Sequence, residues 1–186
     1  MMHSWHADLV VATIGPEGHT RITVAGIRFD AHRLIYATII LLVSLAIYDD
    51  EVESFTSADF VNLVVVVVMP LLALSFAHAF ADALDIQIRT RRRLTTHDRR
   101  HLLAAAFQYL SVGVPVLVLA LLFEAVGGQA WQASEWGQAI GVLSLFFWGA
   151  FAARASGLGP WVQARFALFY GLVGIGIIAV ELLIMH

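Results

Sequence analysis

Long apolar runs separated by short polar connections dominate this chain from about residue 34 onward. A helix needs roughly 20 mostly apolar residues to cross about 30 Å of hydrocarbon, and five runs reach or approach that length. One run contains the solid stretch "VVVVVMP", whereas the strands of a membrane barrel alternate apolar and polar residues. The pattern therefore predicts an all-α polytopic membrane bundle with five transmembrane helices. The runs are Leu34–Tyr48, Phe60–Leu84, Leu102–Val126, Gly137–Ala153 and Trp161–Met185.

The first 30 residues follow a different pattern. Two runs rich in β-branched residues flank "GPEGH", a turn-forming sequence. Residues 1–30 are interpreted as a separate N-terminal segment, either a small β-hairpin or a flexible lead-in to the transmembrane domain of residues 31–186. The opening "MMHSWHADLV" lacks a basic stretch followed by an apolar run, so no cleavable signal peptide is expected.

Composition supports a membrane protein. Hydrophobic residues make up 60% of the 186 residues, charged residues make up 13%, and the mean hydropathy is +0.80. A soluble domain carries roughly 25% charged residues. Because the chain has no cysteine, disulfides and thiolate metal sites are excluded.

The arginines predict the orientation. The chain has eleven arginines and no lysine, and with five spans and a cytoplasmic N-terminus all eleven fall in cytoplasmic parts. The acidic connection "DDEVESFTSAD" (49–59) and the C-terminus fall on the other face. Cytoplasmic loops of membrane proteins carry an excess of basic residues. We therefore expect a multi-pass protein of the cell membrane, most simply a bacterial plasma membrane, with its N-terminus in the cytoplasm and its C-terminus outside.

Ionisable residues form a stripe near the end of the second run. Ser75, His78, Asp82 and Asp85 share one helix face. Ionisable groups inside membranes usually face the bundle interior or a water-filled cavity. A His–Asp pair four residues apart could share a proton or hold a divalent cation. The alternative is that both aspartates pair with nearby arginines such as Arg89 and anchor the helix, which fits Asp85 best.

Other polar residues extend the candidate set. Gln108 and Tyr109 are expected level with the stripe, and Glu181 is a weaker candidate near the opposite end of the last run. A basic cluster follows the stripe, and beside a membrane its nearest partner is anionic lipid rather than nucleic acid. The cluster consists of Arg89, Arg91, Arg92, Arg93, Arg99 and Arg100.

Small residues mark the last two runs. Gly137 and Gly141 form a GxxxG pair, and Gly171, Gly174 and Gly176 follow in the final run. Such residues let helices approach closely. They predict packing within the chain or, alternatively, the face of a homo-oligomer.

Two functions follow from these candidates. The first is a small cation- or proton-linked transporter or channel that uses His78 and Asp82, with Asp85 and Gln108 as further candidates. The alternative is a non-catalytic membrane protein that supports a partner complex or senses anionic lipid. An enzyme is not expected, because one His-x-x-x-Asp spacing falls short of the three protein ligands of a catalytic zinc site. The residues indicate no particular metal or cofactor.

Three short stretches carry a resemblance to a protein family. "FAHAFADAL" (76–84), "RRRLTTHDRR" (91–100) and "GLVGIGIIAVELLIMH" (171–186) are similar to uncharacterised bacterial multi-pass integral membrane proteins. These in turn loosely resemble the five-helix vacuolar iron transporter family. That resemblance implies a five-helix fold and metal transport along carboxylates and methionines. Here the 85–101 loop is rich in arginine and the first run has no interior acid, so no family site residue carries over.

Overall fold

The protein is a helical bundle preceded by a small sheet, as seen in a computed structural model that describes residues 10–14, 20–24, 27–48, 57–128 and 130–185. The strands are β1 (Val10–Ile14), β2 (Thr20–Val24) and β3 (Ile27–Asp30). The helices are α1 (Ala31–Ile47), α2 (Ser57–Thr90), α3 (Thr96–Ser111), α4 (Val114–Ala125), α5 (Ala130–Ala155) and α6 (Pro160–Met185).

The sheet is antiparallel, with strand order β1-β2-β3. The two β-rich runs beside "GPEGH" are β1 and β2, and they pair from Val10 opposite Val24 to Ile14 opposite Thr20. The third strand, β3, was not anticipated, and it leads directly into α1. Asp30 ends this strand and caps the helix, because its side chain accepts a hydrogen bond from the backbone N–H of His32 at 3.0 Å.

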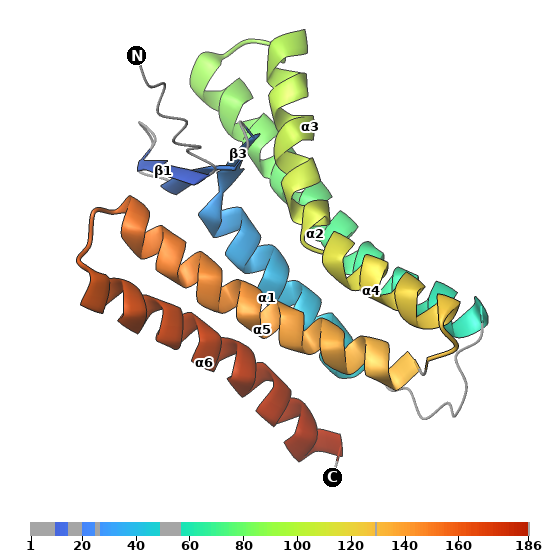
Figure 1. Cartoon of the computed structure of the whole chain (residues 1–186). Helices are drawn as coiled ribbons and strands as arrows, with labels where there is room; N and C mark the ends of the chain where they lie inside the picture. The colour runs from blue at the N-terminus through green and yellow to red at the C-terminus, as the bar shows by residue number, and fades with distance from the viewer. Residues whose placement is uncertain (1–9, 15–19, 25–26, 49–56, 129, 186) are drawn as a thin grey trace, which may run out of the picture.

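Helix α1 lies at the centre of the bundle (Figure 1). Its residues Ala37, Leu41 and Leu45 pack into a core shared with α2, α3, α4 and α5. Its residue Leu42 joins a second core, which includes Leu145 of α5. Helix α1 therefore has neighbours on several faces, while one stripe of it, at Tyr36, Val43 and Ile47, stays exposed.

Three helices are long and apolar enough to cross a membrane. They contain the stretches Ala58–Thr90, Gln132–Ala155 and Pro160–Leu183. The pair α3 and α4, bent by 44°, would make a fourth crossing if it acts as one span. Helix α1 is apolar but has only 17 residues. The helical bundle is therefore confirmed, and within the described residues three or four of its spans are long and apolar enough to cross a membrane, while the count of five and the orientation stay predictions.

The expected span Leu102–Val126 is two helices rather than one. The break at Val112 and Gly113 lies just before Pro115, which lacks the N–H that would continue the helix. Gly113 also lies close against α2, where an added Cβ would come within 2.9 Å of Leu71 Cδ1. Proline chemistry and this close approach together explain the bend.

The expected span Phe60–Leu84 continues as helix to Thr90. At 1.5 Å per residue its 34 residues are about 51 Å long, well beyond the hydrocarbon thickness. Helix α3 returns beside its end after a short turn (Figure 1). The start of α3 carries a capping box, in which Thr95 and Asp98 satisfy each other's backbone N–H groups.

Glycines allow α5 to pack closely within the chain. A Cβ on Gly141 would lie 2.6 Å from Leu42 of α1, and one on Gly149 would lie 2.8 Å from the backbone oxygen of Phe166 in α6. Gly137 is likewise covered, by Val116 and Leu45. The GxxxG pair thus faces α1 and α4, so this face of α5 packs inside the protomer.

The two ends of the bundle differ in charge. Figure 1 shows the sheet, the α2–α3 connection and the α5–α6 connection at one end of the bundle, and the α4–α5 connection and the end of α6 at the other. All eleven arginines lie in the sheet, the start of α1 or these two connections and their flanking turns. We call this the arginine end.

Candidate functional site

An ion pair joins α1 to α2 at the arginine end. Arg33 Nη2 donates to Asp82 Oδ2 at 2.8 Å, and the side chains are 23% and 39% exposed. Arg33 also lies 3.8 Å from the carboxylate of Asp30. The partner of Asp82 is therefore neither His78 nor the arginines that follow it on α2. Its partner is Arg33, which belongs to α1 and lies 49 positions earlier in the chain.

His78 is held by its own helix and by an aromatic ring. Its Nδ1 lies 3.1 Å from the carbonyl oxygen of Leu74, and because a carbonyl only accepts, Nδ1 carries the hydrogen. Its ring centroid lies 4.9 Å from that of Tyr109 on α3. Among the described residues no hydrogen bond or ion pair joins His78 to Asp82, and no group of three His, Cys, Asp or Glu residues could hold a metal ion. His78 and Asp82 thus have other partners in the structure, and their proposed joint binding of a cation stays a prediction.

Gln108 and Tyr109 complete the cluster from α3. The backbone N–H of Asp30 donates to Gln108 Oε1 at 3.1 Å, which ties the sheet to α3. The Arg33 guanidinium carbon lies 6.0 Å from the centroid of the Tyr109 ring, and Tyr109 is only 1% exposed. These contacts bring three helices and β3 together. We call the set the polar cluster: Asp30, Arg33, His78, Asp82, Gln108 and Tyr109.

Asp85 lies outside the polar cluster. Its carboxylate accepts from Arg89 Nε at 2.9 Å, one turn further along α2, and both side chains are more than half exposed. The spacing of four residues gives this pair, as the anchoring interpretation of the sequence expected. Ser75, the other end of the predicted stripe, donates to the carbonyl oxygen of Ala106 at 3.0 Å and fastens α2 to α3.

The α2–α3 connection is braced by a second ion pair. Arg92 Nη1 lies 2.6 Å from Asp98 Oδ2, and that same carboxylate accepts from Thr95. The Arg92 guanidinium and the Thr95 hydrogen bonds hold the pKa of Asp98 well below its usual range. Arg91 adopts a positive φ of 48°, which turns the chain between the two helices. The connection is therefore a defined turn with fixed charges.

Four arginines around this turn point their charge at solvent. In the described part of the chain Arg91, Arg93, Arg99 and Arg100 are exposed and make no ion pair, unlike Arg89 and Arg92. The exposed rings of His97 and His101 meet edge to face beside them, with centroids 4.5 Å apart. We call these four arginines the basic surface.

A second polar contact lies in the opposite half of the bundle. Gln138 Nε2 of α5 lies 3.2 Å and 3.4 Å from the two carboxylate oxygens of Glu181 on α6. Sequence reasoning singled out Glu181 but overlooked Gln138. The sequence did contain a sign that the two residues lie at the same depth. Gln138 is sixteen positions from Arg154 on its helix, and Glu181 is sixteen positions from Arg165 on the next.

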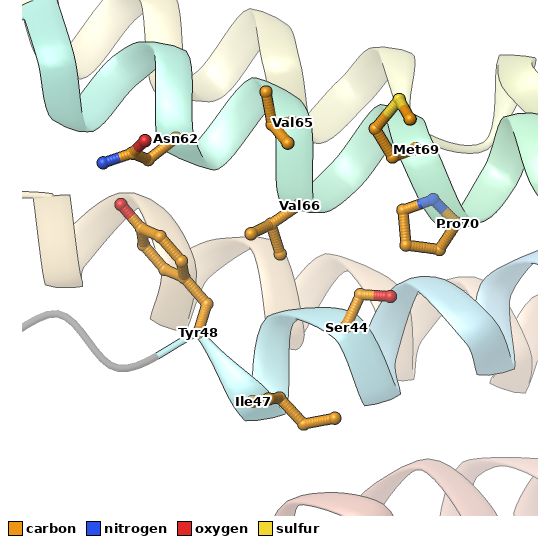
Figure 2. Close-up of a pocket in the computed structure, with 8 residues that line it drawn as sticks. All are labelled: Ser44, Ile47, Tyr48, Asn62, Val65, Val66, Met69 and Pro70. Atoms are coloured by element: carbon orange, nitrogen blue, oxygen red, sulfur yellow. The ribbon is translucent and has the colours of Figure 1, made fainter.

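An apolar groove of about 670 Å³ runs between α1 and α2, away from the polar cluster. Figure 2 shows Ser44 opposite Pro70, and Tyr48 reaching toward Asn62. No residue of the polar cluster lines the groove, so it gives the Asp82 carboxylate no access path. Its lining residues are Ser44, Ile47, Tyr48, Asn62, Val65, Val66, Met69 and Pro70.

Comparison with known proteins adds no assignment. No protein family, curated protein or solved structure matches this chain.

Proposed function

We propose that this chain is a multi-pass integral membrane protein whose arginine end lies in the cytoplasm and binds anionic lipid headgroups. Three helices, and a fourth if the bent pair counts, support membrane insertion. The proposed topology has five crossings, with α1 and the bent α3–α4 pair as the two additional ones. The gathering of every arginine at one end favours this direction, because basic residues collect on the cytoplasmic side.

The basic surface is the observation that carries lipid binding. Its four guanidinium groups are exposed and unpaired within the described chain, and the turn that presents them is held by Arg92 and Asp98. Juxtamembrane Lys and Arg contribute about 1 kcal/mol each near an anionic lipid surface. A rigid turn also keeps the charges together without further ordering on binding.

The test compares two charge-matched variants. We expect the double substitution Arg91→Gln with Arg93→Gln to weaken binding of phosphatidylglycerol more than Arg154→Gln with Arg165→Gln, which removes equal charge from the α5–α6 connection. Native mass spectrometry of the purified protein would count bound phosphatidylglycerol against phosphatidylcholine. Equal binding in wild type and both variants, or no preference for the anionic lipid, would refute the proposal.

A second candidate is proton-linked transport through the polar cluster. The observation in its favour is a partly exposed ion pair, Arg33–Asp82, that bridges α1 and α2 at the arginine end and lies beside His78 and Tyr109. A proton suits this geometry better than a divalent cation, because a guanidinium already occupies Asp82 and the Nδ1 of His78 is engaged by Leu74.

Flux in vesicles separates the second candidate from the first. Asp82→Asn should abolish proton movement by reconstituted protein, measured with an entrapped pH-sensitive dye, while Asp85→Asn should leave it unchanged. Circular dichroism and size-exclusion profiles of both variants would control for folding. Normal flux through the Asp82→Asn protein would exclude Asp82 as the proton carrier.

A further inference from the structure

Glu181 carries a carboxyl group into the apolar half of the bundle that is farthest from the arginines. Sixteen residues separate Arg165 from Glu181 on α6, a rise of about 24 Å. If Arg165 marks the cytoplasmic edge of a core about 30 Å thick, Glu181 lies about 6 Å inside the outer edge. Its neighbours Val180, Leu182 and Leu183 expose more than half of their surface, as lipid-facing residues would.

Gln138 lies at the same depth by an independent measure. On α5, which runs in the opposite direction, sixteen residues separate Gln138 from Arg154. The hydrogen bond of 3.2 Å between Gln138 Nε2 and the Glu181 carboxylate agrees with this equal depth. The contact is therefore a pairing of two polar groups within the span rather than a chance meeting at a frayed helix end.

No described residue on the helices packed around Glu181 brings a positive charge to it. Helix α6 packs against α5 and α1. The nearest other acid on α5 is Glu135, which is exposed one turn beyond Gln138, and α1 has no ionisable side chain between Ile39 and Ile47. Among the described residues Glu181 has one polar partner, the neutral side-chain amide of Gln138.

We propose that Glu181 is a proton-binding site, neutral at physiological pH and oriented by Gln138. An ionised carboxylate in hydrocarbon loses its hydration, and a single amide donor does not replace that hydration. A proton neutralises the charge, and the acid can then donate to the Gln138 carbonyl oxygen while it accepts from the Gln138 amide. The inference rests on the proposed five-span insertion and adds an outer proton-binding group to the inner polar cluster.

A hydrophobic carbodiimide tests the proposal, because it reacts with protonated carboxyl groups in apolar surroundings. Membranes that contain the full chain would be treated with dicyclohexylcarbodiimide at neutral pH, and peptides would be analysed by mass spectrometry. We expect at least roughly a hundredfold more adduct on Glu181 than on the solvent-exposed Glu135, since a glutamate with the ordinary pKa of about 4.3 is protonated in only about one molecule in 500 at pH 7.

Substitutions sharpen the result. Glu181→Gln should abolish the adduct on that peptide, Glu135→Gln should leave it unchanged, and Gln138→Leu should retain it because the apolar surroundings persist. Gln138→Arg should remove it, because a guanidinium stabilises the ionised form. Absence of adduct on wild-type Glu181, or equal labelling of Glu135, would overturn the proposal.

A topology measurement keeps this proposal separate from the proposed function. The chain has no cysteine, so Glu135→Cys and Ser156→Cys each introduce a unique thiol for a membrane-impermeant maleimide. If the two thiols react from opposite sides and Glu181 is not labelled, the proton site alone is refuted. If they react from the same side, α5 does not cross the membrane, and both the proposed topology and the depth of Glu181 that follows from it are refuted.

Discussion

Two aspartates on the same helix have different surroundings. Asp85 pairs with Arg89 one turn away on an exposed face, whereas Asp82 pairs with Arg33 from another helix. Exposed pairs within a helix contribute only about 0.3–0.5 kcal/mol, because water screens them. A pair that links two packed helices also fixes how those helices sit against each other.

The stability of the bundle should reflect this difference. Asp82→Asn is expected to lower the free energy of unfolding by roughly 1–2 kcal/mol, because it removes the nearer of the two carboxylates that pair with the Arg33 guanidinium, at 2.8 Å against 3.8 Å for Asp30. Asp85→Asn serves as the matched control and should change it by less than about 0.5 kcal/mol. Unfolding in mixed detergent and dodecyl sulfate micelles measures both. Equal losses in the two variants would contradict a helix-linking role for Asp82.

Asp98 makes one turn sensitive to pH. Its pKa is lowered by Arg92 and Thr95, so the folded state favours the ionised carboxylate. The resulting stabilisation of the α3 start is fully present above the ordinary pKa of an aspartate, and it is lost as the pH falls below that value. Amide exchange at residues 96–99 should therefore show protection near neutral pH that weakens in strong acid. Asp98→Asn should weaken this protection near neutral pH and remove its dependence on pH, and unchanged protection would exclude the capping role.

At the scale of the elements, glycines decide how closely α5 and α6 approach. Gly149 faces a backbone oxygen of α6, whereas a Cβ on Gly176 would meet nothing within 4 Å. Backbone atoms cannot turn aside as a side-chain end can. An added methyl group should therefore be tolerated at Gly176 but not at Gly149.

An alanine pair tests this difference. Gly149→Ala is expected to destabilise the bundle by roughly 1–3 kcal/mol, because overpacking forces α5 and α6 apart. Gly176→Ala should be neutral or stabilising by up to about 1 kcal/mol, since alanine favours a helix more than glycine does. Micelle unfolding again gives the comparison. If Gly149→Ala leaves the free energy of unfolding unchanged, then α5 and α6 can move apart without destabilising the bundle.

For the whole molecule, the number of crossings determines on which sides the two termini lie. An odd number places them on opposite sides, and an even number places them on the same side. Three, four and five spans all agree with parts of the helix pattern, depending on whether α1 and the bent α3–α4 pair each cross. Reporter fusions at the two ends therefore distinguish an even count from an odd one.

We expect an N-terminal fusion to report the cytoplasm and a C-terminal fusion to report the outside. Alkaline phosphatase is active only after export, so activity should follow the C-terminal fusion alone. Substituting glutamine for Arg89, Arg91, Arg92 and Arg93 should weaken this orientation, because basic residues near span ends retain loops in the cytoplasm. Export of the N-terminal fusion in the wild type would refute the proposed direction.

The site was only partly predictable from the sequence. Helical spacing was sufficient for the Asp85–Arg89 pair, because both residues lie on one turn of one helix. It misassigned Asp82, because its partner Arg33 depends on how α1 packs against α2. The equal spacing of Gln138 and Glu181 from arginines was present in the sequence, but only the antiparallel packing of α5 and α6 makes those spacings meet.

The sequence by itself determined the properties that act through solvent and short-range spacing: the apolar runs that form the helices, the Asp85–Arg89 pair and the gathering of arginines beside the ends of those runs. Each follows from transfer between water and hydrocarbon or from contacts within a few residues. Only the tertiary structure decided which helix pairs with which, that α1 lies at the centre, and that a guanidinium rather than an imidazole meets Asp82. Those contacts join residues far apart in the chain, and many packings satisfy the same apolar pattern.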